Sequence, residues 1–217
     1  MGKIIQITDI NNGKIQKGEE MYKGFLKEIR KKPKGVGDMP ERAKDVLKYF
    51  QIDDFSAGVP IVEILARLGF KVYQSDLEPD GLSAYIAVDS NYKSVFGANK
   101  ITCVNIKNSI GHKKFALAHE LGHYLFDFDD EKDTHYYNTY FPQKDAEKLE
   151  EERANKFASN LLMPEKEFQK KLKELKKAKK NKVDIINELG EYFYVSPTAI
   201  LKRFAELGIS GYEDTEI

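Results

Sequence analysis

Two histidines four residues apart, His119 and His123, lie inside an apolar run of the sequence at residues 115–126. Positions four apart face the same side of an α-helix, so both imidazole rings can bind one metal ion through a ring nitrogen. Glu120 follows the first histidine and can act as a general base toward a water molecule at that ion. The pattern H-E-x-x-H is typical of zinc hydrolases, so we predict Zn²⁺ with His119 and His123 as ligands and Glu120 as the catalytic residue.

A structural role for the two histidines is the alternative. Nearly every other residue at positions 115–126 is hydrophobic, which predicts a buried helix. Buried imidazole and carboxylate groups need partners that offset their desolvation, and a metal ion supplies one. Hydrogen bonds inside the core can also satisfy such groups without a metal. The motif therefore favours a metal site but does not by itself require one.

A third protein ligand must come from elsewhere in the chain, because catalytic zinc usually has three protein ligands and one open position. The next helix is expected over residues 144–162 and offers several glutamates. At 100° per residue, Glu147, Glu150 and Glu151 lie on or near its apolar stripe, whereas Glu152 points to roughly the opposite side. Spacing alone does not choose among the first three.

Composition and charge exclude several classes of protein. The 217 residues include 35 basic and 35 acidic side chains, so the net charge gives no general attraction to nucleic acid or to a membrane. The single cysteine, Cys103, excludes an internal disulfide, and we interpret it as a small core residue within a β-branched run. The first residues lack the long apolar stretch of a secretory signal. We therefore expect a cytoplasmic protein with no membrane partner.

Hydrophobic periodicity predicts the elements that must position the motif. Apolar residues at helical spacing indicate two supporting helices within residues 40–68, and the motif helix is expected over residues 110–126, capped by Asn108 or Ser109. Runs of alternating or β-branched residues lie at positions 70–74, 82–88 and 101–106. We expect an α+β fold with a small, mainly antiparallel three-stranded sheet packed on the motif helix.

Two segments together resemble the ImmA/IrrE family of zinc metallopeptidases. They are F-A-L-A-H-E-L-G-H at residues 115–123 and E-E-R-A-N-K-F-A-S-N-L-L-M-P at residues 151–164. The resemblance extends over about residues 40–210 and implies that Glu151 is the third zinc ligand. Two departures from the family pattern are Lys113-Lys114, where the family usually has an arginine before the phenylalanine, and the first 40 residues, which have no obvious counterpart.

The resemblance and the composition divide the chain into three expected parts. Residues 1–40 are expected to form a polar, loosely packed arm with one helix near residues 19–31. Residues 41–165 are expected to form a zincin-like metallopeptidase core, in which residues 127–143 make a loop near the site. Residues 166–217 are expected to form C-terminal helices, which by resemblance are similar to a helix-turn-helix.

Two regions beside the motif are hypothetical contributors to substrate binding. The strand at residues 101–106 is a candidate edge for pairing with a substrate backbone, and Asn105 lies on it. A purely structural role for this strand is equally compatible with the sequence. The loop offers candidates for binding substrate and stabilising an oxyanion, although such residues are more often simply solvated. These loop candidates are Tyr140, His135, Tyr136 and Tyr137.

By resemblance, the chain is expected to be an intracellular zinc-dependent endopeptidase. Its substrate would be one specific protein, a transcriptional repressor of a phage, mobile element or stress locus. Two alternatives are a DNA-binding regulator with a structural zinc site and a phage or toxin–antitoxin module that acts by protein interaction alone. DNA binding would use the basic run at residues 170–182, but such a run usually forms the solvated face of a helix. We therefore do not expect direct DNA binding.

Overall fold

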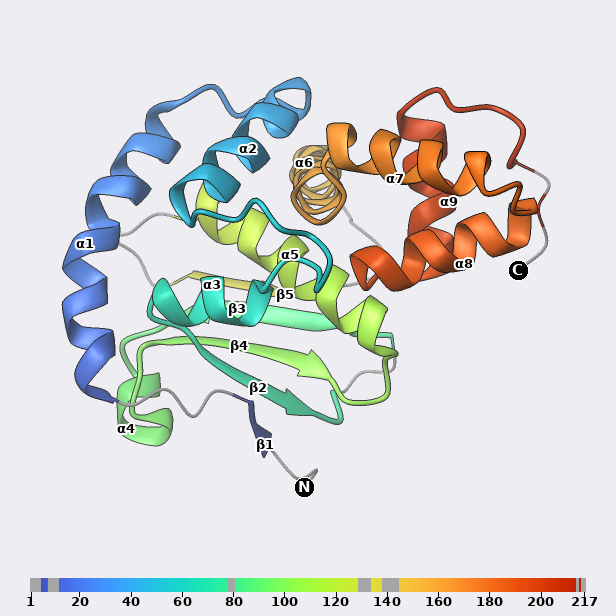
Figure 1. Ribbon diagram of the computed structural model, residues 1–217. Helices are drawn as coiled ribbons and strands as arrows, with labels where there is room; N and C mark the ends of the chain where they lie inside the picture. Colours follow the sequence, from blue (N-terminus) through green and yellow to red (C-terminus); the bar gives the residue numbers. More distant parts are fainter. Residues whose placement is uncertain are drawn as a thin grey trace.

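A mixed sheet carries the motif helix on one face, and further helices cover that helix in turn (Figure 1). The computed structural model of the chain describes residues 5–7, 12–77, 81–128, 134–137, 145–213 and 215. The strands are β1 (Ile5–Gln6), β2 (Lys71–Ser75), β3 (Ala84–Val88), β4 (Lys100–Asn105) and β5 (Thr134–Tyr137). The α-helices are α1 (Asn12–Lys31), α2 (Met39–Tyr49), α3 (Ile61–Arg67), α4 (Tyr92–Phe96), α5 (Ile110–Phe126), α6 (Asp145–Leu162), α7 (Glu165–Lys177), α8 (Lys182–Phe193) and α9 (Pro197–Glu206), and a short 3₁₀ helix η1 (Val36–Asp38) precedes α2.

The strand order is β1-β2-β4-β3-β5, and β2 pairs with β4 in parallel while the other pairs are antiparallel. The α+β class is therefore confirmed, and the sheet is mainly antiparallel as expected, but it has five strands instead of three and contains one parallel pair. The two added strands, β1 and β5, are too short to show a clear alternating pattern. Local alternation also carries no information about the direction of a partner strand.

Strand β4 lies inside the sheet, with β2 on one side and β3 on the other. Its residues pair from Ile101 to Asn105 with β2, and from Lys100 to Val104 with β3. Both backbone edges of the strand are therefore used by the fold. The hypothesis that residues 101–106 form an edge for pairing with substrate is wrong for this reason.

Helix α5 has the bounds that the periodicity predicted, Ile110–Phe126. Ser109 is the N-cap, and its hydroxyl accepts a hydrogen bond from the backbone N–H of His112 at 3.3 Å. Every residue from Ala116 to the end of the helix is buried. The prediction of a buried motif helix is confirmed.

Helix α6 packs closely against α5, and Gly122 in the middle of the motif permits the approach. A Cβ atom at Gly122 would lie 3.2 Å from Ala154 Cα and 3.2 Å from a ring carbon of Phe157, both on α6. Ala154 and Phe157 are themselves buried. The motif glycine therefore brings the backbones of two helices near each other at the level of the histidines.

Helix α1 belongs to the main core, which corrects the expectation of a loosely packed arm. Its apolar residues, spaced as expected for one helix face, are buried in the same cluster as residues of α5 and α6. Those residues are Tyr22, Phe25, Leu26 and Ile29. The Phe25 ring stacks on Tyr49 of α2 with centroids 4.1 Å apart. The many lysines around these positions hid the stripe in the sequence.

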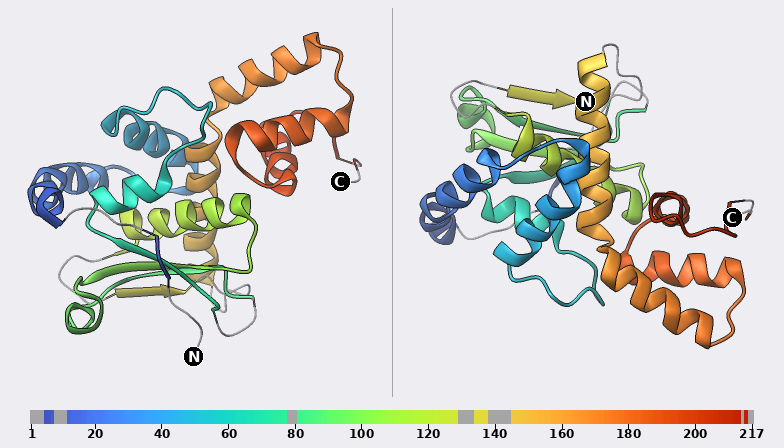
Figure 2. Two further views of the ribbon diagram at one scale, coloured as in Figure 1. Left: turned by 60° about the horizontal axis from the view of Figure 1, so that its bottom comes forward. Right: turned by 90° about the horizontal axis from the view of Figure 1, so that it is seen from above.

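The last three helices, α7 to α9, pack on one another beside the end of α6 that lies away from the sheet (Figure 2). Phe168 of α7 contacts Phe193 of α8 and Phe204 of α9, with centroids 5.7 and 5.3 Å away. The buried guanidinium of Arg203 donates to Asn160 Oδ1 at 3.0 Å and thereby joins α9 to α6. Within the described parts of the chain, no helix combines the length and apolarity that crossing a bilayer requires.

Replacing Phe25 with alanine tests whether α1 is part of the core. The Phe25 side chain is 8% exposed, so its loss leaves a cavity among aromatic rings and should lower the free energy of unfolding by about 3 kcal/mol. Urea denaturation measures the change. Lys27→Ala, at an exposed position on the same helix, is the control and should shift stability by no more than about 0.5 kcal/mol. Equal stability of the two variants would contradict the packing of α1.

Candidate metal centre

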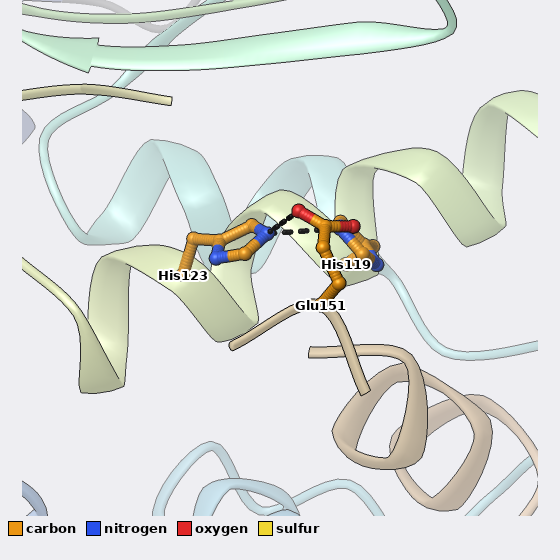
Figure 3. A group of neighbouring side chains, drawn as sticks. All are labelled: His119, His123 and Glu151. Carbon is orange, nitrogen blue, oxygen red and sulfur yellow. Dashed lines mark hydrogen bonds and ion pairs between the residues drawn. The ribbon is translucent and has the colours of Figure 1, made fainter. Parts of the chain in front are cut away.

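Three side chains from two helices converge between α5 and α6. The Nε2 atoms of His119 and His123 lie 2.9 Å apart. Glu151 of α6 reaches both, with one carboxylate oxygen 3.2 Å from His119 Nε2 and the other 3.1 Å from His123 Nε2. Figure 3 shows Glu151 extending from its own helix toward the two rings. Among the described residues, these three form a group whose ligand atoms lie within 4.8 Å of one another.

The second nitrogen of each ring is held by an oxygen acceptor. His119 Nδ1 lies 3.1 Å from Asn155 Oδ1, and His123 Nδ1 lies 2.7 Å from Asp127 Oδ2. Because each oxygen accepts, each Nδ1 carries the proton, and each Nε2 carries a lone pair. Burial lowers the pKa of His119, which favours the neutral ring.

The facing atoms are therefore all acceptors. Two imidazole lone pairs and a carboxylate point into the same space, and hydrogen bonds among them cannot satisfy all three groups. A cation relieves this arrangement directly, and neutral imidazole nitrogens with one carboxylate oxygen are a usual donor set for zinc. The residues present at this place therefore fit a bound metal ion.

Glu120 lies beside this group and is a buried carboxylate. Its side chain is fully buried, and neither carboxylate oxygen has a hydrogen-bond partner among the described residues. Burial raises the pKa of Glu120 to about 8, and the nearby Glu151 adds to the increase while His123 opposes it. Buried polar groups are normally paired, so this carboxyl group calls for a polar partner beyond the described residues.

Sequence reasoning missed the residues that orient the histidines. The Asp127 carboxylate is buried, and it accepts from Arg153 as well as from His123. Arg153 also donates to the backbone carbonyl of Lys34 at 3.3 Å. The signal was present in the spacing, because Asp127 follows His123 by four residues and Asn155 follows Glu151 by four, which places each pair on one helix face.

The N-terminal segment contributes to this arrangement by capping the end of α5. The Arg30 guanidinium donates to the carbonyl of Tyr124, and the Lys34 ammonium donates to the carbonyl of Phe126, each at 2.9 Å. Carbonyl groups at the last turn of a helix have no partner within the helix, and cations there also stabilise the helix dipole. Residues of the expected arm therefore hold the helix end that carries His123 and Asp127.

Other candidates from the sequence lie elsewhere or outside the described residues. Asn105 is buried and satisfied within the fold, since its Nδ2 donates to Leu82 O at 2.9 Å and its Oδ1 accepts from Lys107 N at 3.0 Å. Tyr140 lies outside the described residues. The remaining loop candidates belong to β5, a strand where a loop was expected, and their side chains are not among those described. They are His135, Tyr136 and Tyr137. The side chain of Glu147 is likewise outside the described set.

Replacing Asp127 with asparagine should weaken zinc binding while the protein stays folded. The change removes the charge that fixes the His123 ring and neutralises Arg153, and the loss of such a partner weakens metal binding by about 10-fold or more. Competition with a chromophoric chelator measures the dissociation constant. Asp76→Asn, which breaks a surface ion pair with Lys107, is the matched control and should bind zinc as the unaltered protein does. Equal affinity in both variants would contradict the proposed role of Asp127.

Cys103 should be unreactive in the folded protein. The residue is 4% exposed, and burial raises the pKa of its thiol from 9.0 to about 11. At neutral pH the thiolate fraction is therefore about 100-fold lower than that of an ordinary cysteine. Labelling with a chromogenic disulfide reagent should be slow in buffer and fast in guanidinium chloride. Rapid labelling of the folded protein would show that this thiol is accessible.

Comparison with known proteins agrees with this geometry. A family model, peptidase M78, described as the IrrE N-terminal-like domain, matches residues 65–205. A solved structure, a Mycobacterium tuberculosis transcriptional regulator, matches this chain with a TM-score of 0.50 and 17% sequence identity. The match covers 88% of this chain and 51% of the regulator, so this chain spans about half the length of the regulator. At this identity the match shows a shared fold. No curated protein matches. Because the family match covers more than half of the chain and includes His119, His123 and Glu151, the chain belongs to the peptidase M78 family.

Proposed function

We propose that this protein is an intracellular zinc-dependent endopeptidase. The observation that supports the proposal best is the group of three acceptors from His119, His123 and Glu151. Beside it lies the carboxyl group of Glu120, which has no hydrogen-bond partner in the described part of the chain. Membership in a peptidase family gives this arrangement a chemical context. A structural zinc site would have no need of a buried acid without a partner, because structural sites are closed by their ligands.

Each residue has a defined role in the proposed hydrolysis. Bound zinc would supply a Lewis acid that polarises a peptide carbonyl and lowers the pKa of water. The two Nε2 atoms and the Glu151 carboxylate would hold the ion, while Asn155 and Asp127 keep the rings in the required tautomer. Glu120 would accept the proton of the attacking water on a carboxylate oxygen and then deliver it to the leaving amine.

The environment of Glu120 suits a group that carries a proton between two steps. Its burial favours the protonated form, so taking up a proton from water costs less there than on an exposed carboxylate. The apolar residues of α5 around it also limit the access of bulk water, which strengthens electrostatic interactions at the site.

For the substrate we propose one specific protein, a transcriptional repressor encoded near this protein's own gene. The support is the resemblance to ImmA/IrrE peptidases in residues 115–123 and 151–164. The solved structure that shares the fold is itself a transcriptional regulator, which is compatible with a regulatory setting. Such an enzyme needs one dedicated protein substrate, so general proteolysis is not expected.

Replacing Glu120 with glutamine tests the chemistry. The variant should bind zinc with the affinity of the unaltered protein but lose hydrolysis by about 100-fold or more, because the general base is removed and the ligands are kept. Hydrolysis is measured on a quenched-fluorescence peptide library and, separately, on the repressor encoded by the neighbouring gene. His119→Ala and Glu151→Ala are the comparison variants and should lose zinc.

The outcomes separate the parts of the proposal. If the zinc-loaded protein cleaves library peptides but not the repressor, the proposed substrate is wrong and the proposed peptidase activity stands. No cleavage of either substrate, or equal cleavage by Glu120→Gln, would overturn the peptidase. Retention of zinc by Glu151→Ala alone would assign the third ligand to another acidic residue.

A further inference from the structure

A largely apolar cavity of about 870 Å³ lies on the other side of α5 from the candidate metal centre. Lys114 and His123 are nine residues apart on this helix, which places their side chains about 180° apart around its axis. The cavity is bounded by α5, the start of α3, the loop before it and the sheet. Its apolar walls include Ile52, Val62, Val104, Ile110 and Leu117.

One wall of the cavity contains a poorly solvated ammonium group. Lys114 is partly buried, and its Nζ lies 4.9 Å from the centroid of the Tyr194 ring. Within the described residues it has neither an ion pair nor a hydrogen-bond acceptor. Burial lowers the pKa of Lys114 to about 8. The charged form of this lysine therefore lacks the anionic partner that a desolvated cation normally has.

The loop before α3 approaches this ammonium at Gly58. A Cβ atom at Gly58 would lie 2.2 Å from Lys114 Nζ and 3.2 Å from the carbonyl oxygen of Phe193. Gly58 also has φ at +64°, a conformation that other residues rarely adopt. The backbone of Gly58 therefore lies close to the lysine ammonium at the cavity wall.

Three acidic residues line the cavity, namely Asp53, Asp54 and Glu63; all three are exposed, and none of them forms an ion pair with Lys114. Glu63 is exposed and forms an ion pair with Arg67. Asp54 is exposed and accepts the backbone N–H of Ser56 at 2.9 Å. Lys113 adds a second positive charge to the lining. The lining thus combines apolar walls, two lysines and exposed acidic residues.

We propose that this cavity binds a small amphipathic carboxylate, with the apolar chain against the walls and the carboxylate paired with Lys114. The volume falls within the usual range for small-molecule sites, and an apolar pocket with a few placed polar groups is their usual form. A carboxylate supplies the anion that Lys114 lacks, in surroundings where an ion pair is weakly screened. The cavity lies on the other side of α5 from the metal centre, so its ligand is not the metal ion.

Calorimetric titration of the full chain with dodecanoate, below the concentration at which it forms micelles, tests the proposal. The unaltered protein should bind one dodecanoate, and Lys114→Met should weaken binding by about 10-fold or more, since the apolar chain still binds but the ion pair is lost. Lys114→Arg should keep most of the affinity. Val62→Trp should abolish binding by filling the cavity. Lys166→Met, at an exposed position on α7, is the control and should bind as the unaltered protein does.

Titration with dodecanol, which has the same apolar chain but no charge, distinguishes the contribution of the ion pair from that of the apolar chain. Dodecanol should bind the unaltered protein more weakly than dodecanoate does. It should bind Lys114→Met with the same affinity as it binds the unaltered protein. Thermal unfolding of each variant confirms that it is folded before titration. Absence of dodecanoate binding to the unaltered protein would overturn the proposal, as would equal affinity of Lys114→Met and the unaltered protein. Neither result depends on zinc or on peptidase activity.

Discussion

Three hydrogen-bond acceptors facing one another in a buried space are the constraint on which the rest of this structure depends. With both imidazoles neutral, the lone pairs of His119 and His123 and the carboxylate of Glu151 cannot satisfy one another, and a cation in the space between them relieves this conflict. The same condition explains why Glu120, a fully buried acid, is tolerated beside them. The function that we propose follows from the need of these groups for a positively charged partner.

The surrounding fold serves to bring these acceptors together. Gly122 allows α6 to approach α5, which carries Glu151 to the histidines. Asp127 and Arg153 fix one ring, and Arg30 and Lys34 from the N-terminal segment cap the helix that bears it. Side chains from distant parts of the sequence thus hold the groups of the candidate metal centre in place. The cavity beside Lys114 uses the opposite face of the same helix.

The sequence predicted what depends on local spacing. The bounds of α5 and the pairing of two histidines on one face follow from a 3.6-residue period, and both appear in the structure. The choice of Glu151 among three glutamates required the family resemblance, because all three lie near the same stripe. The position of β4 inside the sheet could not be predicted, since strand neighbours are set by packing across the whole domain. The apolar face of α1 was missed, because its few members are surrounded by lysines.

The most direct measurement of the central claim is the position of zinc in crystals of the zinc-loaded protein, located by anomalous diffraction. We expect a single strong peak between α5 and α6, with His119 Nε2, His123 Nε2 and a Glu151 oxygen each about 2.0–2.2 Å from the ion. A fully loaded crystal with zinc elsewhere, and with these three groups still in contact only with one another, would contradict the proposed metal site.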